Sequence, residues 1–318
     1  MKKKLFILIF VTCAIFLTGH KKYNVTVAHN VSFLEIGDSS LVTEETLQET
    51  PSPITNVSAL QNLSTLRQNY YAVDKKTGMT SDLFDVNSFL STDLKIHAGK
   101  KPTILIFHTH AHEMFADSKD MSDGIIGAGN RLAKDLEEKY GIKCLHITDS
   151  FDTVNGKVQR DGAYERAEPV IKKVLAENPS IELVIDLHRD GVNPNLHLVT
   201  TDNGQQCAKV MFFNGLCKKQ TNGKLQNIPG LSNPYIKTNL ALSFRMQQKM
   251  NELYPNLTRK IYLNAYRYSL HMKDKSMLIE LGAQTNTIEE INNKFSLEGV
   301  KYINYFIIYS LLQQLQDP

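Results

Sequence analysis

Histidine and acidic side chains are concentrated in the segment His108-Thr-His-Ala-His-Glu113. Neutral imidazole nitrogens and carboxylate oxygens serve as ligands in catalytic zinc sites, which use about three protein side chains and keep one position open for water. A further carboxylate, not bound to the metal, is needed to take a proton from that water. Three histidines within five residues can also arise by chance, so this segment alone only suggests metal chemistry.

Two other segments carry side chains of the same kinds. One is Asp186-Leu-His-Arg-Asp-Gly191, and the other contains Glu280, two residues before Gly282. All three segments lie at the ends of apolar runs that predict buried strands. Because the carboxyl ends of parallel strands meet at one edge of a sheet, we expect the three segments to lie close together.

The remaining apolar runs extend this alternation of strands and helices. The predicted strands cover residues 103–107, 143–147, 181–187, 208–214 and 277–281. The predicted helices cover residues 84–91, 129–140, 164–177, 239–253, 288–295 and 300–315. Strands that alternate with helices predict an α/β fold, with a mostly parallel sheet covered by helices on both faces.

Each candidate side chain also has an ordinary structural interpretation. His108 at a strand end could be a hydrogen-bonded core histidine, and Glu113 could be an acid at a helix start. His188 could simply orient the loop at Arg189. An unpaired carboxylate within Leu-Ile-Glu-Leu is costly to bury, so Glu280 should be catalytic or paired with an arginine, either Arg189 or Arg267.

The other histidines are given lesser roles. His110 is a candidate for supporting the ligands or binding substrate, whereas His112 is expected to flank the site. His197 and His271 are interpreted as ordinary polar residues. The chain has no Cys-x-x-Cys pair, so a cysteine metal site is not expected.

The N-terminus predicts export to a membrane. Lys2–Lys4 precede an apolar run over residues 5–17, and the flank at residues 18–22 offers no good cleavage site, which favours an uncleaved anchor over a cleaved signal peptide. We therefore expect a single-pass protein of the cell membrane, with an anchor at 1–22, an extracytoplasmic tether at 23–83 and a catalytic domain at 84–318. The basic cluster keeps the N-terminus inside the cell.

Net charge excludes one class of partner. The 318 residues carry 36 Lys and Arg against 33 Asp and Glu, a net charge of +3. This excess is too small to indicate nucleic acid, and it is compatible with an anionic cell-wall polymer.

Six segments together resemble the family of stage II sporulation protein P, a cell-wall hydrolase of spore-forming bacteria. They run in order from the end of the tether to near the C-terminus. They are Ile104-Leu-Ile-Phe-His-Thr-His-x-x-Glu113, Arg160-Asp-Gly-Ala-Tyr-Glu-Arg166, Ile185-Asp-Leu-His-Arg-Asp-Gly191, Tyr254-Pro-x-Leu-Thr-Arg259, Ala265-Tyr-Arg-Tyr-Ser269 and Leu278-Ile-Glu-Leu-Gly-Ala-Gln-Thr-Asn-Thr287.

The resemblance implies a zinc-dependent N-acetylmuramoyl-L-alanine amidase with added endopeptidase activity on peptidoglycan cross-links. It implies a fold like that of the phosphorylase/hydrolase-like zinc amidases. It also implies action in engulfment, alongside sporulation proteins D and M at the septal membrane.

By motif position, the resemblance assigns zinc ligands and a catalytic carboxylate. The ligands are His108, Glu113 and His188, and the catalytic carboxylate is Glu280. We expect Arg189 to steady the oxyanion or hold Glu280. His110, Asp190 and Arg267 are the expected substrate-binding or supporting residues.

Two other functions stay open. One is a zinc peptidase that acts mainly on stem-peptide cross-links, and the other is a non-catalytic scaffold that binds the wall. The segment 215–227 matches no part of the family pattern and is given no function.

Overall fold

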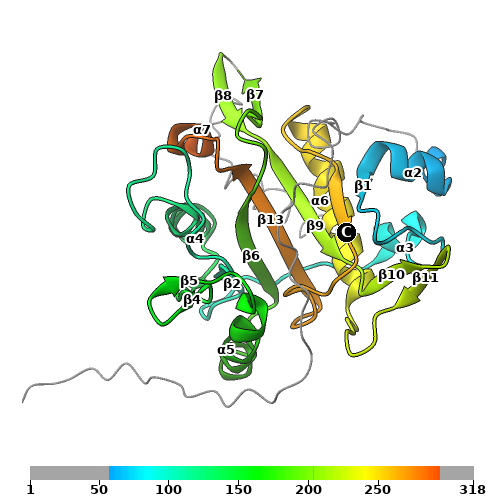
Figure 1. Cartoon of the computed structure of the whole chain (residues 1–318), viewed down its shortest axis with the longest axis horizontal. Helices are drawn as coiled ribbons and strands as arrows, with labels where there is room; N and C mark the ends of the chain where they lie inside the picture. Colours follow the sequence, from blue (N-terminus) through cyan, green and yellow to red (C-terminus); the bar gives the residue numbers. More distant parts are fainter. Residues whose placement is uncertain (1–56, 203, 294–318) are drawn as a thin grey trace, which may run out of the picture. The chain divides into compact units, whose positions relative to one another are not determined.

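A seven-stranded sheet forms the centre of the part of the chain described by the computed structural model, residues 57–202 and 204–293 (Figure 1). The strands lie in the order β1-β12-β9-β13-β6-β2-β3. Their bounds are β1 (Tyr71–Val73), β2 (Ile104–Phe107), β3 (Cys144–His146), β6 (Leu183–Asp190), β9 (Val210–Gly215), β12 (Ile261–Asn264) and β13 (Lys275–Ala283). Every neighbouring pair is parallel except β9 and β13. The predicted fold class, a mostly parallel α/β sheet, is confirmed.

Helices cover both faces of this sheet because its strands bury side chains alternately on each side. Ile104 and Ile106 of β2 belong to the larger core cluster, which also holds residues of α4 (Ile125–Tyr140) and α6 (Ile236–Leu253). Leu105 and Phe107 pack instead with α5 (Ala163–Glu177) in a second cluster. The α5 face therefore differs from the face that α4 and α6 cover.

Shorter elements complete the fold. The helices are η1 (Ala59–Gln61), α2 (Leu63–Tyr70), α3 (Val86–Ser91) and α7 (Ile288–Asn292). Three hairpins lie outside the central sheet: β4 (Thr153–Val154) with β5 (Lys157–Val158), β7 (Val199–Asp202) with β8 (Gln205–Ala208), and β10 (Lys218–Thr221) with β11 (Lys224–Asn227).

The folded part begins earlier than the predicted boundary at Phe84. Strand β1 pairs with β12 at the edge of the central sheet, and Leu60, Leu66 and Tyr70 are buried in the larger core cluster. The residues from 57 to 83 therefore contribute to the central sheet and its core instead of forming part of a tether. The predicted anchor at 1–22 and helix at 300–315 lie outside the described residues. Among the residues that are described, no helix is long and apolar enough to cross a membrane.

The segment without a predicted function forms the β10–β11 hairpin. Its turn, Asn222-Gly223, has positive φ at both residues, as two-residue hairpin turns require. Gln220 donates a backbone hydrogen bond to Lys76, which attaches the hairpin to the loop after β1. A cavity of about 760 Å³ lies between that loop and the hairpin, away from the predicted catalytic residues.

Candidate metal centre

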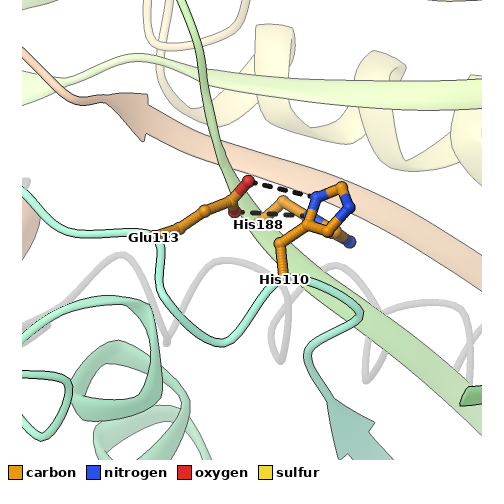
Figure 2. Close-up of side chains that lie close together, drawn as sticks. All are labelled: His110, Glu113 and His188. Atoms are coloured by element: carbon orange, nitrogen blue, oxygen red, sulfur yellow. Dashed lines mark ion pairs between the residues drawn. The ribbon is translucent and has the colours of Figure 1, made fainter. Parts of the chain in front are cut away.

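Two histidines and a glutamate meet beyond the end of β2 and on β6 (Figure 2). Glu113 lies between the histidines, with Oε1 3.4 Å from His110 Nδ1 and Oε2 3.3 Å from His188 Nδ1. One donor atom from each side chain lies within 4.8 Å of the other two. Glu113 and His188 are buried and His110 is half-buried. Two imidazoles and one carboxylate form a donor set used by catalytic zinc sites, so these residues fit such a cation.

Asp186 supports this group from behind His188. Its Oδ1 lies 2.7 Å from His188 Nε2, and its two oxygens accept hydrogen bonds from the backbone N–H and hydroxyl of Thr109. The Asp186 carboxylate therefore links β6 to the loop that carries His110 and Glu113. A ligating histidine characteristically donates its second nitrogen to such a carboxylate, which fixes the ring orientation and the nitrogen left for the metal. Here that nitrogen is Nδ1.

The charges at this group are strongly coupled. Burial acts to raise the pKa of Glu113, but His188 and His110 outweigh it and hold that pKa well below its usual range. Burial acts to lower the pKa of His188, but Asp186 and Glu113 raise it well above its usual value. Without a metal, the two carboxylates therefore favour the protonated form of the His188 imidazole. A metal cation at this place would supply the positive charge next to Glu113 instead of a protonated imidazole.

Tyr164, in the first turn of α5, packs against both histidines. Its ring lies 5.6 Å from the His110 ring, edge to face, and 6.4 Å from the His188 ring, nearly parallel. Helix α5 begins after Gly162, whose φ of +74° is a conformation that favours glycine. The start of α5 thus places an aromatic ring beside the two histidines.

Glu280 stands beside the ligand group on the neighbouring strand. It is in register with His188 across the parallel β13–β6 pair, so both side chains project from the same face. A bulge follows between Glu280 and Ala283, an irregularity that is common next to active sites. The Oε2 atom of Glu280 is buried and accepts no hydrogen bond from the described residues. Burial, with help from Asp190, raises the pKa of Glu280 to about 8.

His108 lies elsewhere, which revises the predicted ligand set. Extended residues alternate in direction, so Phe107 faces α5 and His108 faces α4. Its Nδ1 donates a 2.7 Å hydrogen bond to the Leu187 carbonyl, and its Nε2 lies 2.8 Å from His146 Nε2. The ring is fully buried, which lowers its pKa to about 4. His110, predicted as a substrate-binding or supporting residue, lies in the group of three donors, and His108 does not.

The predicted partners of Glu280 are engaged elsewhere. The guanidinium of Arg189 donates to the carbonyls of Met114 and Asp190, so it holds the loop after Glu113 instead of Glu280. The backbone N–H of Arg189 does donate to Glu113 Oε2 at 2.9 Å.

The other two predicted supporting residues form ion pairs. Asp190 accepts a 2.8 Å hydrogen bond from the buried Arg259, while Arg267 pairs with Glu168 of α5 at 2.7 Å. His112 lies 2.8 Å from Asp152, a flanking contact outside the group of three donors.

Three residues of the site were not predicted as such. Asp186 has a signal in the sequence, because a spacing of two along a strand puts it on the same face as His188. Arg160 lies between β5 and α5 and Tyr164 in the first turn of α5, and their spacing alone gives no sign of metal chemistry. Arg160 Nη1 lies 3.4 Å from Glu113 Oε1.

Fold and site together define an α/β protein with a candidate metal centre at the carboxyl ends of parallel strands. The chain belongs to the family described as stage II sporulation protein P, whose family model matches residues 55–297.

Similar individual proteins include a curated relative and two solved structures. Stage II sporulation protein P of Bacillus subtilis (strain 168) is 23% identical over 209 residues, which cover 61% of this chain and 48% of that protein. The chain thus spans about half the length of this relative. An N-acetylmuramoyl-L-alanine amidase from Clostridium difficile 630 is 12% identical, with a TM-score of 0.38, over 68% of this chain and 96% of the other. The CwlD amidase from Clostridioides difficile, in complex with the GerS lipoprotein, is 16% identical, with a TM-score of 0.40, over 67% and 98%.

Proposed function

We propose that this protein is a zinc-dependent peptidoglycan hydrolase of sporulation that cleaves the amide between the lactyl group of N-acetylmuramic acid and L-alanine. One observation carries the proposal: His110, Glu113 and His188 converge, and Glu280 lies one strand away in register with His188, with a buried Oε2 that accepts no hydrogen bond from the described residues. Membership of the stage II sporulation protein P family supports the substrate.

In this proposal His110, Glu113 and His188 hold the zinc ion. When bound, zinc polarises a carbonyl and lowers the pKa of a coordinated water to about 7. Asp186 keeps a proton on Nε2 of His188, so that Nδ1 remains available as a ligand. Tyr164 packs against both imidazoles and limits their rotation.

Glu280 is the proposed general base and acid. Its buried Oε2 takes a proton from the attacking water and later donates it to the nitrogen of the leaving L-alanine. Burial raises the pKa of Glu280 to about 8 in the metal-free protein. A zinc ion bound beside Glu280 would lower that pKa and favour the carboxylate form that accepts a proton. The proposal therefore gives Glu280 the proton-transfer role, which side chains bound to the metal cannot fill.

The direct test compares wild type and Glu280→Gln on purified dye-labelled sacculi, with zinc content measured in both. We expect the variant to keep its zinc and release no dye. Full dye release by the variant would remove Glu280 from the mechanism. Active wild-type protein without stoichiometric zinc would refute the proposed metal centre.

Mass spectrometry of the released fragments separates the amidase from its rivals. Free stem peptides with an N-terminal L-alanine identify the amidase. Split cross-links with the lactyl amide intact identify a peptidase, and both products together identify the added endopeptidase activity. A scaffold would bind sacculi without releasing product and without any effect of a chelator.

The cellular setting belongs to the same proposal. We propose that residues 1–22 anchor the chain in the cell membrane with the catalytic domain outside, and that it acts with sporulation proteins D and M during engulfment. Support comes from the basic and apolar N-terminal sequence and from the family. Protease treatment of intact protoplasts should degrade the catalytic domain, and protection of that domain would contradict the topology.

A further inference from the structure

Arg160 reaches from the surface into the candidate metal centre. Its Nη1 lies 3.4 Å from Oε1 of Glu113, yet its side chain is 43% exposed while that of Glu113 is 4% exposed. An ion pair with one exposed partner and no short hydrogen bond contributes little stability. The guanidinium is therefore positioned at the mouth of the site without being held there tightly.

The backbone around Arg160 is, by contrast, firmly fixed. The guanidinium of Arg166 donates hydrogen bonds to the carbonyls of Phe151, Gln159 and Asp161, on both sides of Arg160. The Arg160 carbonyl itself accepts from the N–H of Ala163 in the first turn of α5. The fixed backbone thus places the exposed guanidinium at the mouth of the site, where it can pair with an anionic group.

Other arginines near the site are engaged in structural contacts. Arg189 donates to two backbone carbonyls, Arg259 pairs with the buried Asp190, and Arg267 pairs with Glu168. Arg160 instead contacts a proposed zinc ligand. A zinc ion at Glu113 would neutralise that carboxylate and leave the Arg160 guanidinium to face incoming substrate.

We infer that Arg160 binds a substrate carboxylate, namely the free α-carboxylate of the second stem-peptide residue, and thereby selects non-amidated peptidoglycan. This inference rests on the proposed amidase function. The second residue lies one residue beyond the scissile amide, and when it is a glutamate joined through its side chain its α-carboxylate stays free. A guanidinium recognises such a group through two parallel hydrogen bonds, which a primary amide cannot reproduce.

The test uses the zinc-loaded full chain and two muropeptides that differ only at this group, one the acid and one its primary amide. We expect wild type to favour the acid by about ten- to a hundredfold in kcat/KM, mostly through KM, as for loss of a hydrogen bond to a charged group. Arg160→Gln should abolish the preference by lowering kcat/KM for the acid muropeptide alone, and Arg160→Lys should keep part of the preference. Lys157→Gln, an exposed change in β5 three residues before Arg160, serves as the matched control.

Calorimetry provides a readout that does not depend on turnover. The zinc-loaded Glu280→Gln protein should bind the acid more tightly than the amide, and adding Arg160→Gln should equalise the two. Equal affinities of the Glu280→Gln protein for the acid and the amide would overturn the inference. So would an Arg160→Gln variant whose kcat falls equally on both substrates, since that pattern indicates a contact with the oxyanion. Failure of wild type to cleave either muropeptide would instead refute the proposed function, while the calorimetric comparison would still decide the role of Arg160.

Discussion

Asp186 and His188 lie two residues apart on the same face of β6, and the carboxylate of Asp186 lies 2.7 Å from Nε2 of the His188 ring. The same carboxylate accepts two hydrogen bonds from Thr109, on the chain segment that carries the other two candidate metal ligands, His110 and Glu113. One buried acid therefore orients a proposed ligand and ties together the two segments that form the centre. Its role is positional, because it does not belong to the group of three donors.

Replacing Asp186 by Asn should weaken zinc binding by about 10- to 100-fold, the usual effect of losing a carboxylate behind a ligating histidine. The amide can still accept from Thr109, but it carries no charge to hold a proton on Nε2. Competition with a chromogenic chelator measures the affinity. Asp149→Asn, an exposed change, is the control. Unchanged affinity in a folded Asp186→Asn protein would show that His188 does not depend on this carboxylate.

The sheet and the meeting of its strand ends could be predicted from the sequence, because buried parallel strands are continuous apolar runs. Strands β1 and β12 were not predicted. Strand β1 lies in the segment interpreted as a tether, and its pairing with β12 at the sheet edge depends on a partner far away in the sequence. The reversed direction of β9 relative to β13 is likewise a matter of topology, which local patterns do not encode.

The sequence predicted that the three segments would meet, and they do, whereas the roles of the individual side chains stay predictions. Glu113, His188 and Glu280 are where the strand ends predicted them to be, with Glu113 and His188 adjacent and Glu280 in register with His188. Residues two apart face the same side of an extended chain, so the different positions of His108 and His110 depend on how the chain turns after β2 ends at Phe107. Sequence reasoning could not determine that turn.

Replacing His110 by Ala should remove stoichiometric zinc, because a three-residue ligand set loses one member. Replacing His108 by Ala should leave zinc in place but destabilise the fold by roughly 2–4 kcal/mol, since it empties a buried site and leaves the Leu187 carbonyl without its donor. Metal analysis and urea unfolding of the two variants separate these effects. A folded His108→Ala protein without zinc would return His108 to the ligand set.

Glu280 should make the stability of the metal-free protein depend on pH. Its pKa is raised from 4.5 to about 8 in the fold, so between these values the native state keeps a proton that the unfolded chain loses. The free energy of unfolding should therefore fall as pH rises from about 4.5 to about 8, by an amount on the order of a few kcal/mol. Glu280→Gln should flatten this fall and be the more stable protein at pH 9.

Urea unfolding at pH 5, 7 and 9 in the presence of a chelator measures this dependence. The two proteins should differ least at pH 5, where Glu280 is largely protonated in the native state. Parallel profiles for wild type and variant would show that Glu280 is not responsible for the slope.

Gly129 of α4 packs directly against the His108–His146 pair, and its replacement by Ala should be destabilising. A Cβ there would lie 2.7 Å from His146 Nε2 and 2.8 Å from His108 Nε2, closer than real Cβ contacts. Overpacking of this kind costs about 1–3 kcal/mol, which the better helix propensity of Ala offsets by roughly 1 kcal/mol. Gly99→Ala is the matched control, because nothing lies within 4 Å of its added Cβ. Since His108 lies outside the group of three donors, zinc content should stay at the wild-type level while the melting temperature falls in Gly129→Ala alone. Loss of zinc without loss of stability would mean that the histidine pair, and not only His110, Glu113 and His188, belongs to the metal centre.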